Sequence, residues 1–344
     1  MPPRKVLILQ TAFLGDVVLT LPLVQRLHKV FPEAEIDFVA TPRGAQVLRN
    51  HPAIRSIIEY DKRGRQRGYA PIISLSRMLK KGGYDVAIVP HRSIRSAVLI
   101  ALSRIPIRIG FDTSAGSILF SHLVPYRKDI HEIERNLSLL SPLGIGEGER
   151  EVPSMYPSQN DAEAVDRFFV ASGIAPGEKL IALAPGSVWA TKRWLPDRFA
   201  ELAGEFVARG YKVVCVGGKE DAELASAIAG KGGNRWVISA AGRFSILESA
   251  ELLRRSSLLV TNDTAPMHLA VAMKVPVVAV FGATVPAFGF GPYGSADVVV
   301  ESEGLSCRPC SIHGGSQCPI GTFDCMKNVR TTDVAAAAAR LLAG

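Results

Sequence analysis

Residues 260–273 read VTNDTAPMHLAVAM, a stretch typical of a strand that is followed directly by a helix. Apolar residues 258–260 end a buried-strand run, the cluster Asn262-Asp263-Thr264 favours a helix N-cap, and an amphipathic run follows. Unpaired backbone N–H groups and the positive dipole end make such a helix start an anion site, and His268 lies about one turn further on. The alternative is that Asp263 or Thr264 only caps the helix and His268 packs in the core.

A second segment of the same kind precedes it. Ala184-Pro185-Gly186-Ser187 follows the apolar residues 180–183, and Lys192 comes five residues later. Gly186 permits close approach of the backbone to a ligand, Ser187 supplies a hydroxyl, and Lys192 supplies a mobile positive charge. Loops at the carboxyl ends of parallel strands converge on one crevice, so the two segments together predict a phosphate-bearing ligand.

Apolar runs alternate with helical patterns along the chain, which predicts an α/β fold with parallel sheets covered on both faces. The expected strands are 6–9, 36–39, 57–60, 86–89, 180–183, 213–216, 236–239, 258–260 and 277–281. The expected helices include 16–30, 41–48, 73–80, 93–103 and 332–342, and a capping box at Ser245 and Glu248 starts another.

Residues 144–157 are rich in Gly, Glu and Pro and are expected to form a linker. We therefore expect two Rossmann-like, doubly wound domains, residues 1–155 and 156–344, facing each other across a cleft. One large sheet is the alternative, and the length of 344 residues makes it less favourable.

Composition indicates a globular protein, with 47% hydrophobic and 21% charged residues. The chain enters its first strand without a signal-peptide pattern, which predicts a cytoplasmic protein. The uncharged run 275–296 contains three prolines and four glycines, so it is expected to form a strand and loops instead of a membrane span.

The net charge of +8 lies wholly in the first half. Residues 1–160 hold 22 Lys and Arg against 14 Asp and Glu, whereas the remainder holds 18 of each. The first domain is thus expected to meet an anionic partner, such as nucleic acid, an anionic lipid surface or a phosphorylated glycolipid. The basic residues are not interleaved with stacking aromatics, which disfavours nucleic acid.

The loop after the first strand carries a candidate catalytic carboxylate. Gly15 permits a tight turn, and Asp16 begins the next helix at the ligand-binding edge of the first sheet. A carboxylate there can act as a general base for an acceptor hydroxyl. The alternative is a plain helix N-cap.

Arginines follow two further strands of the first domain and are expected to bind phosphates or carboxylates of an acceptor. The alternative is that they are solvated surface charges. These candidates are Arg63, Arg65, Arg67, Arg92 and Arg95.

Four motifs in family order resemble the heptosyltransferase family of GT-B glycosyltransferases: LGDVVLTLP (14–22), APGSVWATKRW (184–194), VGGKEDAE (216–223) and TNDTAPMHLA (261–270). The resemblance covers nearly the whole chain and is greatest to the second heptosyltransferase, with the first and third as alternatives. It implies a GT-B fold and inverting transfer of heptose from ADP-L-glycero-D-manno-heptose onto the inner core of lipopolysaccharide, with no cofactor and no catalytic metal.

The resemblance also implies roles for individual residues. Asp16 matches the acceptor-activating base, and Lys192 is implied to bind the donor and to assist catalysis. The other implied donor-binding residues are Ser187 at the diphosphate, one of Glu220, Asp221 and Glu223 at the ribose, Phe244 at the adenine, and Asp263, Thr264, Ala265 and His268 at the phosphates and sugar. A glycine often follows the Asp-Thr pair in the family, whereas this chain has Ala265-Pro266, and Pro266 removes one N–H donor.

Inversion at an anomeric carbon requires a base on one face and stabilisation of the leaving group on the other. We expect Asp16 to supply the base from one domain and the donor-binding residues to stabilise ADP from the other, with domain closure during the cycle. The expected partners are the nucleotide sugar and an anionic glycolipid, with peripheral contact at the inner membrane and a monomeric enzyme.

Four of the five cysteines cluster near the C-terminus, at Cys307, Cys310, Cys318 and Cys325. We expect a structural loop, with a tetrahedral metal site as the alternative. Two other classes of function remain open. A non-hydrolysing sugar-nucleotide epimerase would not need the basic first half, and a nucleotide-binding regulatory module would not need Asp16.

Overall fold

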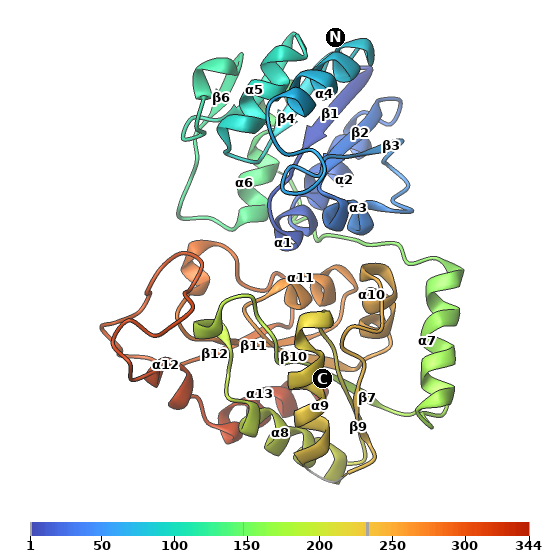
Figure 1. Ribbon diagram of the computed structural model, residues 1–344, viewed down its shortest axis with the longest axis vertical. Coiled ribbons are helices and arrows are strands. Elements are labelled where there is room, and N and C mark those ends of the chain that lie inside the picture. The colour runs from blue at the N-terminus through green and yellow to red at the C-terminus, as the bar shows by residue number, and fades with distance from the viewer. Residues whose placement is uncertain (1, 147, 232–233, 344) are drawn as a thin grey trace. The chain divides into compact units, whose positions relative to one another are not determined.

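The computed structural model describes residues 2–146, 148–231 and 234–343, and the chain divides into two compact units between Tyr156 and Pro157. Within the described residues, each unit is built on one six-stranded parallel sheet with helices on both faces (Figure 1). The prediction of two doubly wound α/β domains is confirmed. Residue 147, in the expected linker, lies outside the described residues.

The first sheet has the order β3-β2-β1-β4-β5-β6. Its strands are β1 (Lys5–Leu9), β2 (Glu35–Ala40), β3 (Ser56–Glu59), β4 (Val86–Val89), β5 (Ile107–Phe111) and β6 (His122–Val124). The order reverses between β1 and β4, and this is the position at which doubly wound sheets bind ligands. The sequence did not predict β5 and β6, because Arg108 interrupts the apolar pattern of β5 and β6 is only three residues long.

The helices of the first unit are α1 (Leu14–Val18), α2 (Leu21–Val30), α3 (Pro42–Leu48), α4 (Ala70–Lys81), α5 (Ile94–Leu102) and α6 (Glu132–Ser138). The single helix expected over 16–30 is wrong, since the chain breaks after Val18 and restarts at Leu21. In one continuous helix, Pro22 would lack the N–H that bonds to the carbonyl four residues earlier, and the proline ring would clash with that carbonyl. In the first turn of a new helix, by contrast, proline is favoured.

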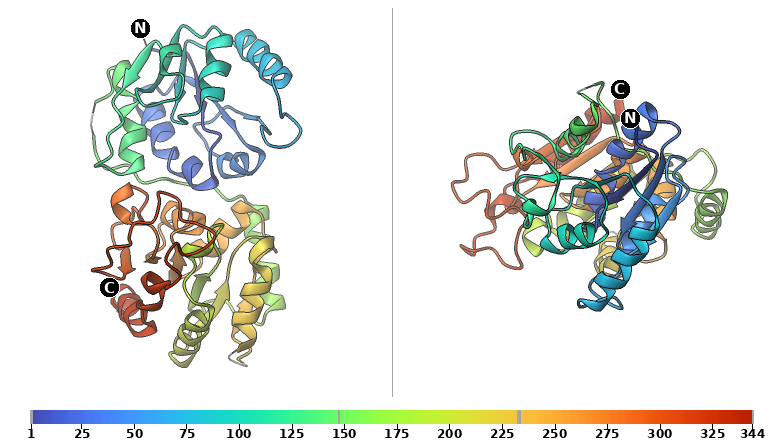
Figure 2. Two further views of the ribbon diagram at one scale, coloured as in Figure 1. Left: turned by 60° about the vertical axis from the view of Figure 1, so that its left-hand side comes forward. Right: turned by 90° about the horizontal axis from the view of Figure 1, so that it is seen from above.

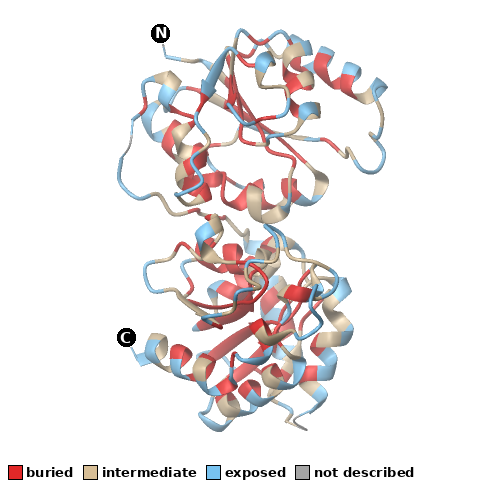
Figure 3. Cartoon of the chain, turned by 90° about the vertical axis from the view of Figure 1, so that its left-hand side faces the viewer, coloured by how far each residue is buried: buried red, intermediate tan, exposed pale blue. Residues whose placement is uncertain are grey.

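The second sheet has the order β12-β11-β10-β7-β8-β9, the same winding as the first. Its strands are β7 (Leu180–Ala184), β8 (Lys212–Cys215), β9 (Val237–Ser239), β10 (Leu258–Asn262), β11 (Val277–Phe281) and β12 (Val298–Glu301). The order reverses between β7 and β10. Strands β7, β8, β10 and β11 are buried along their whole length, as Figure 3 shows in red.

The helices of the second unit are α7 (Gln159–Ala171), α8 (Pro196–Ala208), α9 (Ala222–Lys231), α10 (Ile246–Arg254), α11 (Ala265–Ala272), α12 (Asp324–Lys327) and α13 (Thr331–Ala343). Helices α8, α9 and α13 cover one sheet face around a core that includes Trp194 and Phe199 (Figure 2). The predicted capping box is confirmed, because Ser245 Oγ accepts the Glu248 N–H at 3.2 Å. Among the described residues, every helix is too short or too polar to cross a membrane.

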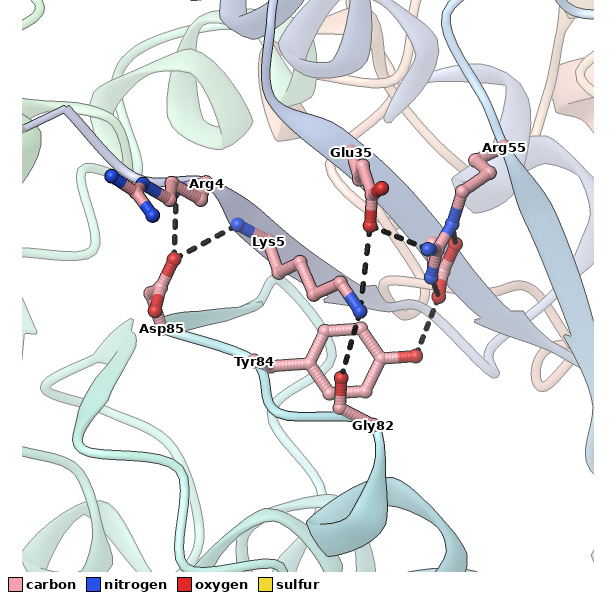
Figure 4. A network of polar contacts seen from close by, with 8 residues as sticks. Arg4, Lys5, Glu35, Arg55, Gly82, Tyr84 and Asp85 are labelled. Carbon is pink, nitrogen blue, oxygen red and sulfur yellow. Dashed lines mark hydrogen bonds and ion pairs between the residues drawn. The ribbon is translucent and has the colours of Figure 1, made fainter.

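A polar network closes the amino-terminal edge of the first sheet (Figure 4). Buried Asp37 on β2 accepts hydrogen bonds from Arg55 Nε at 2.9 Å and from the Tyr84 hydroxyl at 2.6 Å. Asp85 accepts the backbone N–H groups of Arg4 and Lys5 at 2.8 and 2.9 Å. The network therefore ties β1, β2 and β4 together at the edge opposite the carboxyl ends of these strands.

We predict that Asp37→Ala lowers the free energy of unfolding by about 1–3 kcal/mol, because it leaves the buried Tyr84 hydroxyl without its acceptor and removes the partner of the exposed Arg55 guanidinium. Urea unfolding measures the effect. The matched control is Asp85→Ala, which loses only two backbone hydrogen bonds and should cost less. Equal losses in the two variants would contradict the assignment of Asp37 as the centre of the network.

Candidate functional site

The carboxyl ends of β7 and β10 bring two predicted loops of the second unit together. Val260 and Thr261 lie opposite Leu183 and Ala184 in the parallel register, so the segments that follow these strands are neighbours. Asn262 joins them, since its Nδ2 donates to Pro185 O at 2.8 Å and its Oδ1 accepts the Trp194 N–H at 2.9 Å. Asn262 is fully buried, so both loops are fixed by satisfied hydrogen bonds.

An ion pair lies at this junction. Lys192 Nζ is 2.6 Å from Asp263 Oδ2, and their side chains are only 13% and 9% exposed. Thr284, which follows β11, donates its hydroxyl to the same oxygen at 2.7 Å. Because an ammonium group has three donors, Asp263 can orient Lys192 while two N–H groups remain for an anion.

The start of α11 adds further donors. Thr264 is the N-cap residue, but its side chain makes no capping hydrogen bond, and its buried Oγ1 has no hydrogen-bond partner among the described residues. The amide of Ala265 is among the first N–H groups of the helix, which lack intrahelical acceptors. Buried His268 follows on the same helix. Thr264 therefore occupies the N-cap position, as the alternative expected, but its side chain does not cap the helix.

Ser187 and the acidic residues 220–223 lie beside the loop that carries Lys192. Arg193 Nε donates to Ser187 O at 2.8 Å, and the Ser187 hydroxyl accepts the Trp189 N–H at 3.3 Å. Asp221 accepts the Gly218 N–H at 2.9 Å and packs on Gly186, where an added Cβ would lie 2.0 Å from its carboxylate. Asp221 thus shapes the loop.

The other residues expected to contact the ribose and the adenine are Glu220, Glu223 and Phe244. Glu220 and Glu223 are exposed, and Glu220 lies against Gly218. Phe244 is half-buried and packs edge-on against Phe168, with ring centroids 5.2 Å apart. Glu220 and Glu223 can therefore meet a ligand more readily than the partly buried Asp221 can.

The cysteine segment contacts the Lys192 loop. Gly315 O accepts hydrogen bonds from the Thr191 N–H at 3.1 Å and from its hydroxyl at 3.0 Å. Gly314 leaves little room, since a Cβ there would lie 3.0 Å from Lys192 Cγ. The thiols of Cys307, Cys310, Cys318 and Cys325 are free, and no three His, Cys, Asp or Glu side chains in the described ranges form a metal-binding group.

In the first unit, Asp16 lies in the first turn of α1, at the carboxyl end of β1. Phe13 occupies the N-cap, and its N–H donates to Asp16 Oδ2 at 2.9 Å, so Asp16 is not the N-cap residue itself. Burial raises the pKa of Asp16 to about 6, although the Phe13 N–H, Lys62 and Arg92 oppose the shift. A carboxylate with a pKa near neutrality is suited to general-base catalysis.

Basic side chains surround this carboxylate. Lys62 Nζ donates to Thr11 Oγ1 at 3.2 Å, and burial, with Arg63 and Arg95 nearby, lowers the pKa of Lys62 to about 8. His91 Nδ1 is 3.1 Å from the same hydroxyl oxygen, and burial, Lys62 and Arg92 lower its pKa to about 4. The ring of His91 is therefore neutral at physiological pH.

The predicted acceptor arginines have different surroundings. Arg63 lies over the Phe13 ring at 5.8 Å, and Arg95 Nη1 donates to Lys62 O at 3.2 Å, which places both beside the β1 loop. Arg92 stacks on Tyr126 at 4.0 Å. Arg65 and Arg67 are exposed in the loop after β3.

The sequence analysis missed several residues of these sites. Lys62 directly precedes Arg63, and Asn262 belongs to the motif TNDTAPMHLA, so the sequence held a local signal for both residues. Thr284, Tyr126 and Glu132 had none, because only tertiary contacts bring them to the sites.

Comparison with known proteins identifies the family of the chain. Residues 72–318 match the family model of glycosyltransferase family 9 (heptosyltransferase), a range that includes the donor-side loops and excludes Asp16. Lipopolysaccharide heptosyltransferase 3 of Escherichia coli is 27% identical over 281 residues, 79% of this chain and 82% of that protein.

Two solved structures share the fold over nearly the whole chain. A family 9 glycosyltransferase from Veillonella parvula has a TM-score of 0.90 and 26% identity, covering 99% of this chain and 97% of that one. ADP-heptose lipopolysaccharide heptosyltransferase II of E. coli has a TM-score of 0.81 and 22% identity, covering 98% of each chain. The GT-B fold expectation is thus confirmed.

We predict that Asp16→Asn stabilises the protein above pH 6. The folded-state pKa of about 6 exceeds the reference value of 3.8, so the ionised carboxylate costs stability at neutral pH, and this cost decreases as the pH falls from 6 toward 4. Thermal unfolding from pH 4 to 8 should show a higher midpoint for Asp16→Asn at pH 7.5 and convergence near pH 4. Asp61→Asn is the control, since Asp61 accepts two loop N–H groups and its loss should give no gain. An unchanged midpoint for Asp16→Asn at pH 7.5 argues against the raised pKa.

Proposed function

Because the chain belongs to glycosyltransferase family 9, we propose that it transfers heptose from ADP-heptose to a sugar hydroxyl with inversion at the anomeric carbon. The observation that supports this most directly is the Lys192–Asp263 pair at the start of α11, where an anion would meet oriented donors. Membership of this family also sets aside the epimerase and the regulatory module.

The donor diphosphate is proposed to bind at the β7 and β10 loops. Lys192 supplies charge, and Ser187, Thr264, Ala265 and His268 supply hydrogen-bond donors around the helix start. The accessible Glu220 is proposed to bind the ribose, because Asp221 is already engaged with Gly218. Phe244 is proposed to pack on the adenine, since it is half-buried at the start of α10.

The proposed reaction uses the negative charge of Asp16 to remove a proton and the positive charge near Lys192 to stabilise ADP. Asp16 accepts the proton of the acceptor hydroxyl, and the oxygen attacks the anomeric carbon on the face opposite ADP. The bond from that carbon to the diphosphate oxygen breaks, and the negative charge that develops on ADP is stabilised by Lys192 and the α11 start. The residues named above thus account for proton removal from the acceptor and for stabilisation of the departing ADP. The two substrates must come into contact during the catalytic cycle.

The acceptor is proposed to be the anionic inner core of lipopolysaccharide, met at the cytoplasmic membrane face. The name of the E. coli relative refers to this glycolipid. Lys62, Arg63, Arg92 and Arg95 lie around the loops that follow β1, β3 and β4, where a phosphorylated sugar would be neutralised. Exposed Arg65 and Arg67 would extend the same contact. Among the heptosyltransferases, we propose the second, which adds to an existing heptose.

Asp16→Ala is predicted to reduce kcat by about 10²–10⁴-fold, the usual contribution of a general base, and to leave ADP affinity nearly unchanged. The assay measures ADP released from ADP-heptose with a purified heptose-bearing core acceptor, and calorimetry measures ADP binding. Asp61→Ala, in the neighbouring loop, serves as the charge-matched control. Retention of more than a tenth of the wild-type kcat would remove Asp16 from the mechanism, and absence of any turnover by the wild type with this pair would overturn the proposed substrates.

Lys192→Met is predicted to weaken ADP binding by about 10–100-fold, because one hydrogen bond to a charged group contributes about 1.5–3 kcal/mol. Transfer should slow as well, since the charge acts on the diphosphate in both the ground and transition states. Calorimetry with ADP gives the readout, and Lys231→Met, at the exposed end of α9, is the control. ADP affinity equal to wild type in Lys192→Met would exclude it from the donor site.

A further inference from the structure

A long loop, residues 302–323, joins β12 to α12 (Figure 1). We call residues 308–315 of this loop the strap. It is bonded at one end to the segment that follows β11, where the Cys310 N–H donates to Ala283 O at 2.9 Å. Its other end is bonded to the loop that carries Lys192. The strap therefore links two of the segments that form the candidate anion site.

Arg308 begins the strap, and its side chain is only 7% exposed. Its Nε donates to Gly282 O at 2.5 Å and its Nη2 donates to Thr284 O at 2.9 Å, so both acceptors lie just after β11. At the end of the neighbouring strand β12, it also donates to Ser302 O at 2.5 Å and to Glu301 Oε2 at 2.7 Å. One guanidinium thus fixes the carboxyl ends of two strands.

Gly314 and Gly315 form the last part of the strap and pack on the Lys192 loop. The Gly315 N–H donates to Thr191 Oγ1 at 2.7 Å, and the Thr191 N–H and hydroxyl both donate back to Gly315 O. A Cβ at Gly314 would lie 3.0 Å from Lys192 Cγ and 3.2 Å from its Cδ. The backbone at Gly314 therefore lies directly against the lysine stem.

Thr284 connects the Arg308 end of the strap to the ion pair. Thr284 is 2% exposed, and its hydroxyl donates at 2.7 Å to Asp263 Oδ2, the oxygen that lies 2.6 Å from Lys192 Nζ. The second donor restricts rotation of the carboxylate, because the hydroxyl comes from a backbone position that Arg308 holds. An unbroken series of contacts therefore runs from Arg308 through Thr284 and Asp263 to Lys192.

A lysine at an anion site needs this support. Its ammonium group is a point charge on a flexible four-carbon stem, so the backbone alone does not determine where Nζ lies. Ordering such a side chain only when the ligand binds would reduce affinity, because rotamer freedom would then be lost on binding. With its stem against Gly314 and its Nζ on Asp263, Lys192 is already ordered before the ligand arrives.

We propose that the strap belongs to the donor-binding machinery and that Arg308 and Thr284 are positioning residues for the donor diphosphate. Arg308 holds the segment after β11, and the Thr284 hydroxyl fixes the Asp263 carboxylate. Asp263 and Gly314 then keep Lys192 in the position from which it binds the anion. This inference rests on the proposed binding of the diphosphate by Lys192 and deepens it.

The first experiment measures ADP affinity by calorimetry in Thr284→Val and Thr284→Ser. Valine keeps nearly the shape of threonine without the hydroxyl, so ADP should bind about three- to tenfold more weakly, the effect of one ordinary hydrogen bond. Serine keeps the hydroxyl and should restore most of the affinity. Wild-type affinity in Thr284→Val, or an equal loss in both variants, overturns the proposal.

A double-mutant cycle separates positioning from a general loss of stability. Thr284→Val in the Lys192→Met background should weaken ADP binding by less than about twofold relative to Lys192→Met alone, because the hydroxyl acts through the lysine. A purely structural change would add its full loss in both backgrounds. Additive losses therefore contradict the positioning role of Thr284.

The third experiment tests the anchor of the strap. Arg308→Lys keeps the positive charge but cannot reach the carbonyls of two strand ends at once, so ADP affinity should fall by about three- to tenfold. Arg255→Lys is the matched control, since Arg255 at the C-cap of α10 also donates to a carboxylate and a carbonyl, Glu251 Oε1 at 2.7 Å and Ala162 O at 3.1 Å.

The control should lose thermal stability and keep wild-type ADP affinity, because α10 ends at the edge of the second sheet opposite the anion site. An equal fall in affinity in both variants, or unchanged affinity in folded Arg308→Lys, overturns the role of Arg308. The Thr284 variants test the proposal whether or not Arg308→Lys folds.

The two proposals fail in different ways. If Lys192→Met binds ADP as the wild type does, Lys192 is not in the donor site, and the inference about the strap falls with it. If Lys192→Met binds ADP weakly while Thr284→Val binds it as the wild type does, only the positioning roles of Thr284 and Arg308 are overturned.

Discussion

The reversal of strand order in each sheet is the constraint on which both candidate sites depend. Parallel strands place all their carboxyl ends at one edge of the sheet. The connections that follow β1 and β4 leave in opposite directions, and so do those that follow β7 and β10. The backbone is therefore open between these strand pairs, where polar loops remain accessible. Asp16, Lys192, Asp263 and Thr264 all belong to segments that follow these strands.

The second unit shows how a buried polar framework makes a candidate anion site rigid. Asn262 satisfies both of its side-chain ends within the protein, which leaves the adjoining Asp263 free to orient Lys192. Thr284 fixes Asp263 from a third strand end. Such preorganised charges need little rearrangement when negative charge develops on a leaving group, which is the physical basis of electrostatic catalysis.

The first unit combines two opposing electrostatic effects. Its positive charge suits an anionic partner, but positive charge near Asp16 makes that carboxylate a weaker base. Burial counters this effect, and the pKa of Asp16 remains about 6. The stack of Arg92 on the Tyr126 ring holds this cation in place through an aromatic face.

The sequence by itself determined the α/β class, the division near residue 156, nine of the strands and the loops that carry Asp16, Ser187, Lys192 and Asp263. Local periodicity, cap residues and glycine positions encode these features, because they act within a few residues. The break between α1 and α2 was also readable from Pro22, although the amphipathic pattern across it concealed the signal.

Only the tertiary structure decided the strands β5, β6 and β12, the packing of Asp221 on Gly186, and the burial of Glu132 and Arg135. A Glu or Arg in a sequence is by default a solvated surface residue. Its burial depends on which groups meet it and accept its hydrogen bonds, and in this chain the Tyr126 oxygen and Ile130 O accept from Arg135. The pKa of Asp16 likewise follows from burial and from charges on two other segments, those that carry Lys62 and Arg92, which no local pattern records.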